Sequence, residues 1–290
     1  MLTGVSNVMK RKVVKNEIVT PPLISVITVS YNAVATIEQT ILSVINQTYP
    51  NIEYIIIDGG SKDGTIDIIR KYADQIAYWV SEPDEGIYDA MNKGIKIATG
   101  EWINFMNCGD SFLDMKVLNK IFISSILNEY EGVDILYGNR VSVYSFGKYF
   151  HLVDSLENFS KSFPIFHQST FVRRVLLENN LFDLKYNICA DYNQLFSLYK
   201  QGYVFKYIPQ YISICECENG VSTQLRNELK RVKENELIIN NKLSFKSYFY
   251  LFRIMLKTKV RVGLEKIYPQ YFTPLKKEVR LLKNKRFAKL

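Results

Sequence analysis

The chain has 290 residues, of which 47% are hydrophobic and 23% are charged, and its formal net charge is +8. This composition is typical of a globular protein with a sizeable core, and the length allows one large domain or two small ones. The sequence has no run of about 18 apolar residues, which excludes a bilayer-spanning helix. Residues 1–20 also lack the apolar core of a signal peptide, so we expect a cytoplasmic protein.

The first part of the chain alternates buried strands with amphipathic helices. After Pro21 and Pro22, the β-branched run from Leu23 to Val29 is typical of a strand that is buried on both faces. The elements expected next are helix 37–45, strand 54–57, helix 66–72, strand 76–80, helix 87–98 and strand 102–106. This alternation predicts βαβ units and a mostly parallel sheet flanked by helices. Each polar loop follows a strand, so these loops should gather at one edge of the sheet.

Beyond Ser111 the alternation is weaker. The segments with a recognisable pattern are 134–144 (one or two strands), 163–172 (extended) and 191–201 (helix). From Val221 onward the pattern is helical and basic. The division that we predict is a lead-in 1–20, a main domain 21–222 with halves 21–115 and 116–222, and a basic, aromatic, helical tail 223–290.

The tail carries most of the positive charge. It contains 18 Lys and Arg against 5 Asp and Glu, a surplus of +13, which leaves −5 for residues 1–222. Between Ser244 and Lys266, aromatic and apolar residues alternate with cations, as in an amphipathic helix. Such a helix can lie on an anionic membrane surface. Packing of its aromatic face on the main domain is the alternative.

A polar loop with one carboxylate ends the last strand of the alternating region. The apolar run from Trp102 to Met106 stops at Asn107-Cys108-Gly109-Asp110. In open α/β sheets, ligands bind in the crevice at the carboxyl ends of the strands. A carboxylate in this position can bind a hard divalent cation. Capping of the following turn is the alternative role of Asp110, because Asp is common in turns.

Five segments of the chain resemble those of the family 2 glycosyltransferases, which have the glycosyltransferase-A fold. The matching segments are Ile24 to Asn32, Gln47 to Glu53, Asp58 to Thr65, Gly86 to Gly94 and Ala98 to Glu101. They cover about residues 23 to 115, and their order and spacing make the match specific. The resemblance implies a nucleotide-sugar donor, Mg²⁺ or Mn²⁺, and transfer with inversion to a glycan or lipid-linked glycan of the bacterial cell surface.

The resemblance also implies a nucleotide pocket at Val29, Tyr31, Asp58, Asp89 and Asn92. Tyr31 follows a strand end, where its ring could stack on uracil. Asp58 ends the second strand, where it could accept the imide N–H of uracil or cap its own turn. Asp89 and Asn92 lie three apart and share one helical face. That face lines the donor pocket in the family, and an exposed polar face is the alternative.

The remaining candidate residues belong to the reacting end of the site. Asp110 resembles the last acid of the family's Asp-x-Asp metal motif, of which this chain keeps one acid, so a metal would also bind donor phosphates and water. Asn107 and His167 are expected on the diphosphate or acceptor side, with a buried, hydrogen-bonded histidine as the alternative. Asp191 is expected to be the general base that deprotonates the acceptor hydroxyl. Its alternative role is helix capping.

Other classes of protein share parts of this pattern. A Rossmann dehydrogenase needs G-x-G-x-x-G after the first strand, and the loop from Ser30 to Ala33 has no glycine. A nucleotidyltransferase shares the sheet and the metal, but its glycine-rich basic loop is also missing. The acidic main domain argues against a nucleic-acid-binding protein. The alternatives that stay open are a nucleotidyltransferase and a non-catalytic nucleotide-sugar-binding module.

Overall fold

A computed structural model describes residues 20–123, 128–145, 147–216 and 225–243, together with residues 248, 249, 252, 253, 255, 256 and 260. The strands are β1 (Ile24–Ser30), β2 (Ile52–Asp58), β3 (Tyr78–Ser81), β4 (Trp102–Phe105), β5 (Asp110–Phe112), β6 (Ile135–Tyr144), β7 (Gly147–His151), β8 (Thr170–Arg173) and β9 (Phe205–Glu216). The α-helices are α1 (Ile37–Ile45), α2 (Thr65–Lys71), α3 (Ile87–Ile97), α4 (Val117–Phe122), α6 (Arg174–Asn179), α7 (Ala190–Lys200) and α8 (Leu225–Asn240). The described 3₁₀ turns are η1 (Ala73–Gln75), η2 (Asn128–Tyr130), η3 (Leu156–Ser160) and η4 (His167–Ser169).

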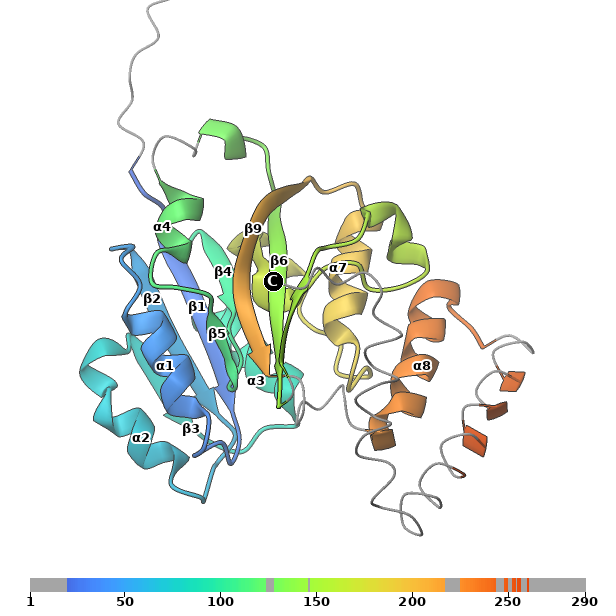
Figure 1. Cartoon of the computed structure of the whole chain (residues 1–290), viewed down its shortest axis with the longest axis horizontal. Coiled ribbons are helices and arrows are strands. Elements are labelled where there is room, and N and C mark those ends of the chain that lie inside the picture. The colour runs from blue at the N-terminus through green and yellow to red at the C-terminus, as the bar shows by residue number, and fades with distance from the viewer. Residues whose placement is uncertain are drawn as a thin grey trace, which may run out of the picture.

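The first half of the chain forms the parallel part of a nine-stranded sheet whose order is β3-β2-β1-β4-β8-β6-β9-β5, with β7 paired to β6. β1 pairs in parallel with β2 and β4, and β2 pairs in parallel with β3. The βαβ arrangement expected from the sequence is confirmed. Figure 1 shows α1 and α2 at one side of the sheet and α7 and α8 at the other end of the molecule.

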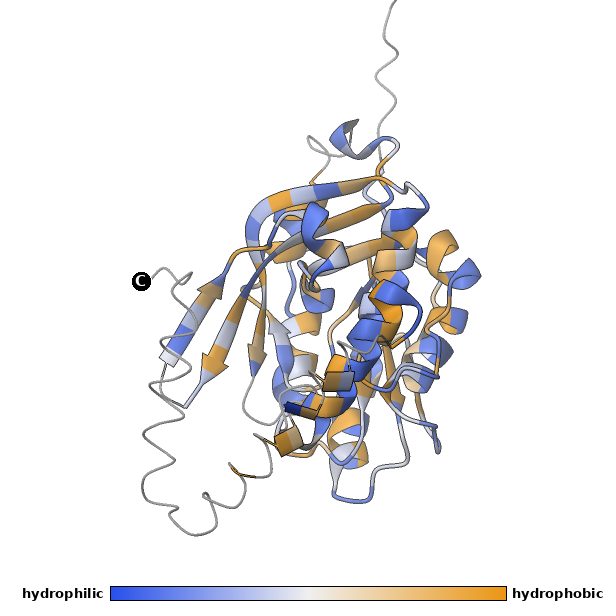
Figure 2. Ribbon diagram, turned by 90° about the vertical axis from the view of Figure 1, so that its right-hand side faces the viewer, coloured by the Kyte–Doolittle hydropathy of each residue, from blue (hydrophilic) through white to orange (hydrophobic). Residues whose placement is uncertain are grey.

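The core lies on both faces of the sheet. Ile27 and Val29 of β1 pack in one cluster with Met91 of α3, whereas Ile24 and Val26 pack in a second cluster with the apolar residues of α1. The strand is therefore buried on both faces, as its continuous apolar run predicts. The helices show apolar and polar residues side by side along their length (Figure 2), which is typical of helices that cover a sheet with one face.

The second half makes the sheet mixed. β8 runs antiparallel to both β4 and β6, and β6 runs parallel to β9 with an irregularity at Gly138–Arg140. The segment 134–144 thus holds one strand, and the expected extended segment 163–172 holds the short turn η4 followed by β8. The parallel character predicted from the sequence belongs to the first half of the sheet.

Strand ends bring the polar loops together at one edge of the sheet. The register aligns Ser30 with Asp58 and Asp58 with Ser81, so these three residues form a row across β1, β2 and β3. The antiparallel pairing of β4 with β8 brings the loop after β4 close to η4. Residues that are far apart in the sequence, such as Asn107 and His167, consequently meet at this edge.

The first part of the predicted tail packs on the main domain. In Figure 1, α8 lies beside α7. Ile238 of α8 is buried in the core cluster that contains α7, and Leu237 packs against the same cluster. The expected amphipathic helix 244–266 lies mainly outside the described residues.

Candidate active site

Tyr31 and Asn32 form the turn at the end of β1. The Tyr31 side chain is 66% exposed, which leaves its ring accessible to a ligand. Asn32 has a φ of 46°, and Asn is among the few non-glycine residues that adopt this left-handed conformation. Its side-chain oxygen accepts a hydrogen bond from the Lys62 N–H, and its own N–H donates to the Ser61 hydroxyl. The turn that carries Tyr31 is thus fixed to the loop after β2.

Asp58 ends β2 and is fully buried. Its oxygens accept hydrogen bonds from the Ser30, Ser61 and Ser81 hydroxyls and from the backbone N–H groups of Gly60 and Ser61, at 2.6–3.1 Å. Burial raises the pKa of the Asp58 carboxyl group, but these donors outweigh it and hold the pKa below its usual value. A carboxylate offers about four lone-pair sites, so five donors leave none for a ligand. The expected contact with uracil would require one of these bonds to break.

The candidates on α3 make contacts within the protein. Asp89 accepts a hydrogen bond from the Glu85 N–H at 3.1 Å and lies 3.8 Å from the ammonium group of Lys93. Asn92 is buried, and its amide group both donates to the carbonyl oxygen of Phe182 and accepts from the N–H of Phe182, at 2.9 and 2.8 Å. Asn92 therefore joins α3 to the loop after α6, because both of its polar groups are used there. Val29 is buried in β1, and its carbonyl accepts from the Cys108 N–H.

Asp110 is buried between α1 and β9. It begins β5, its residue exposure is 7%, and the Thr40 hydroxyl donates to its backbone carbonyl. Burial raises the pKa of the Asp110 carboxyl group, and hydrogen bonds from Cys215 and Gln168 oppose this shift only in part. A buried carboxylate of this kind gains stability when a cation lies beside it.

The oxygens near Asp110 fit part of a divalent metal site. The side-chain oxygen of Asn107 is buried and has no hydrogen-bond partner among the described residues. Carboxylate and amide oxygens are the ligands that Mg²⁺ and Mn²⁺ take in proteins. In the described part of the chain, no three His, Cys, Asp or Glu side chains gather as a complete site would require. The protein can therefore supply some of the ligands, and the donor phosphates and water would supply the others.

Asp191, the candidate base, has a defined set of partners. It lies in the first turn of α7, and its side chain is 13% exposed. Its Oδ2 is 3.1 Å from Nδ1 of His167, and its Oδ1 accepts a hydrogen bond from the Tyr88 hydroxyl at 3.0 Å and from the Tyr192 N–H at 2.9 Å. Burial, followed by the negative charge of Asp191, raises the pKa of the Tyr88 hydroxyl well above its usual value. Tyr88 thus remains a hydrogen-bond donor to Asp191 over the physiological pH range.

His167 connects the two ends of the site. Its Nε2 is 3.3 Å from the side-chain nitrogen of Asn107, while its Nδ1 faces Asp191. A continuous row of contacts, which we call the catalytic row, consequently runs through Asn107, His167, Asp191 and Tyr88. It links the loop after β4 to the N-terminus of α7. The structure thus brings Asn107, His167 and Asp191 together.

Two residues of this region were not predicted from the sequence. Tyr88 lies in the segment Gly86 to Gly94, but only the fold shows that its hydroxyl reaches α7. Glu234 of α8 is buried and accepts hydrogen bonds from the backbone N–H groups of residues 187–189, directly before Asp191. No local signal marks it, because glutamate on a helix is usually exposed.

The sheet has a parallel half and a mixed half, and the site contains a buried carboxylate. This is the architecture of an α/β transferase that uses a nucleotide-sugar. The model of the family "Glycosyl transferase family 2" matches residues 25–176, and the chain belongs to this family. The chain is 31% identical to a PGL/p-HBAD biosynthesis glycosyltransferase of Mycobacterium bovis over 179 residues, which are 59% of this chain and 68% of that protein.

Two solved structures share the fold. Staphylococcus aureus TarS 1-349 in complex with UDP-GlcNAc has a TM-score of 0.59 and 16% identity, and the match covers 81% of this chain and 71% of TarS 1-349. The mannosyltransferase PcManGT from Pyrobaculum calidifontis, in complex with GDP-Man and Mn²⁺, has a TM-score of 0.59 and 17% identity. That match covers 92% of this chain and 82% of the mannosyltransferase. These likenesses confirm the glycosyltransferase-A fold expected from the sequence.

Proposed function

We propose that this chain is an inverting glycosyltransferase that moves a hexosyl or N-acetylhexosaminyl group from a UDP-sugar to a glycan or lipid-linked glycan, in the synthesis of a cell-surface polysaccharide. The observation that carries the proposal is the catalytic row. It supplies a carboxylate with fixed orientation beside the polar edge of the parallel sheet, where nucleotides bind in open α/β folds. The complexes of TarS with UDP-GlcNAc and of the mannosyltransferase with GDP-Man support a nucleotide-sugar donor.

In this proposal Asp191 is the general base. His167 and Tyr88 hold its two oxygens, so that the carboxylate keeps one orientation while part of it remains accessible. Asp191 takes the proton of the acceptor hydroxyl as that oxygen forms a bond to the anomeric carbon of the donor. The bond from this carbon to the nucleoside diphosphate breaks with the electron pair on the leaving phosphate oxygen. Attack from the face opposite the leaving group inverts the configuration.

A divalent metal, Mg²⁺ or Mn²⁺, is part of the proposal. Asp110 would hold it, with the side-chain oxygen of Asn107 as a neighbouring donor, and the Mn²⁺ complex of the mannosyltransferase supports this choice. When bound, such an ion neutralises charge on the leaving diphosphate. The single acid of this segment predicts that the ion binds weakly until the donor is present.

The release of UDP from UDP-sugars tests this function. The purified chain is incubated with UDP-GlcNAc or UDP-glucose and Mn²⁺, and slow release of UDP without an acceptor is expected. A binding module would bind the donor without releasing UDP. A nucleotidyltransferase would leave the UDP-sugar intact and would release pyrophosphate only from UTP and a sugar 1-phosphate. With an acceptor, NMR of the product should show the β-anomer from an α-linked donor. A product that retains the α-configuration would refute inversion.

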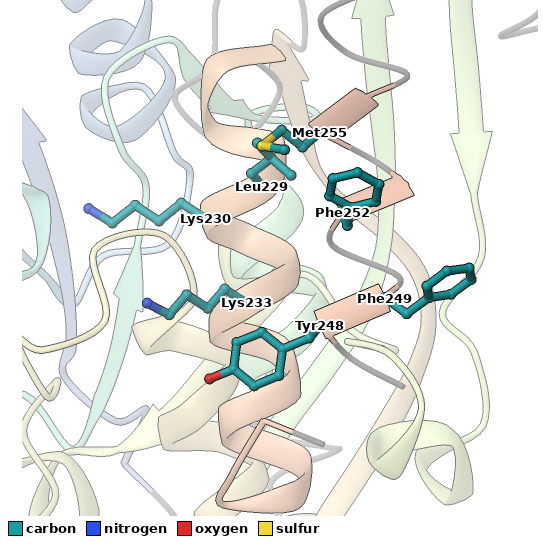
Figure 3. A pocket seen from close by; sticks show the side chains of 7 residues that line it. All are labelled: Leu229, Lys230, Lys233, Tyr248, Phe249, Phe252 and Met255. Carbon is teal, nitrogen blue, oxygen red and sulfur yellow. The ribbon is translucent and has the colours of Figure 1, made fainter. Parts of the chain in front are cut away.

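We also propose peripheral attachment to an anionic membrane through the segment after α8. The residues that line a cavity of about 710 Å³ here are Leu229, Lys230, Lys233, Tyr248, Phe249, Phe252 and Met255 (Figure 3). The Tyr248, Phe249 and Phe252 side chains are 60%, 59% and 55% exposed. Aromatic rings beside lysines suit the headgroup region of an anionic bilayer. No helix in the described ranges is long and apolar enough to cross a membrane.

Sedimentation with liposomes tests the attachment. The full-length chain should sediment with phosphatidylserine-containing liposomes at ~0.05 M salt, where screening is weak, and stay in solution with neutral ones. Substituting Tyr248, Phe249 and Phe252 by serine should release it. The Leu152→Ser variant, which removes an equally exposed apolar side chain elsewhere, is the control. Equal sedimentation of the triple variant and the parent would refute the attachment.

A further inference from the structure

The loop after β3 carries a carboxylate with a free oxygen beside the exposed ring of Tyr31. Asp84 is partly buried, and its Oδ1 accepts a hydrogen bond from the Gly86 N–H at 2.8 Å. Its Oδ2 receives no hydrogen bond among the described residues, and no described cation forms an ion pair with it. This oxygen differs from those of Asp58, whose lone pairs are all used by protein donors.

Gly59 shows where the free oxygen lies. A Cβ atom at Gly59 would be 2.5 Å from Oδ2 of Asp84 and 3.3 Å from Cδ2 of Tyr31. The bare backbone of Gly59, the Asp84 carboxylate and the Tyr31 ring therefore meet at one point, directly after the end of β2. Gly59 is not required here by a positive φ. A Cβ atom at this position would displace the Asp84 carboxylate from its place beside the Tyr31 ring.

We infer that Asp84 reads the nucleotide base, selecting bases that present a ring N–H, while Tyr31 supplies the stacking surface. The inference rests on the proposed nucleotide-sugar function and assigns the contact to Asp84 instead of Asp58. A carboxylate only accepts hydrogen bonds. It therefore pairs with N3–H of uracil or thymine, or with N1–H and the amino group of guanine. The corresponding ring nitrogens of cytosine and adenine carry no hydrogen, so those bases set a ring lone pair against the carboxylate and offer it only their exocyclic amino group.

Asp58 keeps a structural role in this scheme. Its five hydrogen bonds tie the ends of β1, β2 and β3 into one rigid edge. The Gly59 and Gly60 backbone, on which the base would lie, follows directly. Stacking of a base on an aromatic side chain does not depend on the identity of the base. Discrimination among bases should consequently depend on Asp84, and affinity common to all bases should depend on Tyr31.

Titration calorimetry with UDP, TDP, GDP, CDP and ADP, each with Mn²⁺, tests the inference. The parent should bind the nucleotides with a ring N–H at least ~10-fold more tightly than CDP and ADP, since an unpaired polar group is costly. Among UDP, TDP and GDP, the tightest ligand identifies the base. Asp84→Ala should reduce the preference for UDP over CDP to within ~3-fold. Tyr31→Ala should weaken the binding of every nucleotide and leave the preference for UDP over CDP unchanged.

The Glu85→Gln variant is the matched control, because it removes one negative charge from the exposed side chain next to Asp84. It should keep the parent preference, which separates base reading from general repulsion of the diphosphate. A parent-like preference for UDP over CDP in folded Asp84→Ala would overturn the inference and leave the proposed function standing. If the parent binds none of the five nucleotides, the proposed function fails as well.

Discussion

Glu234 provides a prediction that links α8 to the candidate base. The residue is 5% exposed. Its carboxylate accepts hydrogen bonds from the N–H groups of Asn187, Ile188 and Cys189 at 3.0, 2.9 and 2.9 Å. These residues lead directly into α7, where Asp191 lies in the first turn. The negative charge also lies at the positive end of the helix dipole.

The expected loss of stability follows from these three bonds. A hydrogen bond to a charged group contributes about 1.5–3 kcal/mol, so three give roughly 4–9 kcal/mol as an upper limit. Desolvation of the carboxylate opposes this, and the amide of the exposed Asn187 can be rehydrated in a variant. We therefore expect Glu234→Ala to lower the free energy of unfolding by about 2–4 kcal/mol. The melting temperature should fall by roughly 5–12 °C.

Activity should fall for a second reason, since the same loop holds the partners of the base. The Tyr88 hydroxyl, with its single proton, lies 2.8 Å from the Ile188 carbonyl oxygen and 3.0 Å from Oδ1 of Asp191, so it bridges the loop and the candidate base. Below the melting temperature, Glu234→Ala should therefore reduce the rate of sugar transfer, while the affinity for UDP stays close to that of the parent. Glu234→Gln keeps the shape of the side chain but only one acceptor oxygen. Its melting temperature and its rate of sugar transfer should lie between those of the parent and of Glu234→Ala.

Differential scanning fluorimetry and a UDP-release assay measure both effects. Glu236→Ala, on the same helix, is the control, because the Glu236 side chain is partly exposed and accepts a hydrogen bond from the exposed Asn240. It should change the stability by less than ~0.5 kcal/mol. If Glu234→Ala melts within about 1 °C of the parent, the three hydrogen bonds do not stabilise the loop and the reasoning is refuted.

Three further predictions concern the site and its surroundings. Asp191→Asn should lower transfer by ~10²–10⁴-fold, the usual effect of removing a general base, with unchanged UDP binding by calorimetry; lost UDP affinity would remove Asp191 from the base role. Asp110→Asn should lower transfer by at least ~10²-fold through loss of the metal contact, and near-parent turnover both with Mn²⁺ and in EDTA would contradict a metal role. Burial lowers the pKa of His151 from 6.5 to about 4, so the unfolded chain binds this proton first as the pH falls. In urea titrations between pH 6.5 and 4, the parent should therefore lose more stability than His151→Gln; parallel curves for the two proteins would exclude this account.

The order of the elements up to Phe105 could be predicted from the sequence. The strands β1, β2 and β4 are rich in β-branched and aromatic residues, and the helices between them show helical spacing of apolar residues. These signals are local, because each comes from a few neighbouring residues. The edge of the sheet that holds the site also followed from them, since parallel strands all end on the same side.

The second half was harder to predict for a physical reason. Its strands pair with partners that are far away in the sequence, and β8 joins β4 and β6 in the antiparallel direction. Short strands such as β5 and β8 contain too few residues to show a period. The hydrogen bonds between Asn92 and Phe182 are also non-local, because only the packing of α3 on the loop after α6 brings the two residues close.

The sequence by itself determined which carboxylates lie at the ends of the strands, because the position of a residue after a strand is a local property. Only the tertiary structure decided which of them have an oxygen available. The lone pairs of Asp58 are used by serines of β1, of β3 and of the loop after β2, whereas Oδ2 of Asp84 stays free beside Gly59. Hydrogen-bond saturation depends on donors from distant segments. Whether a carboxylate oxygen stays available is therefore decided only when the chain is folded, and the neighbouring residues in the sequence do not indicate it.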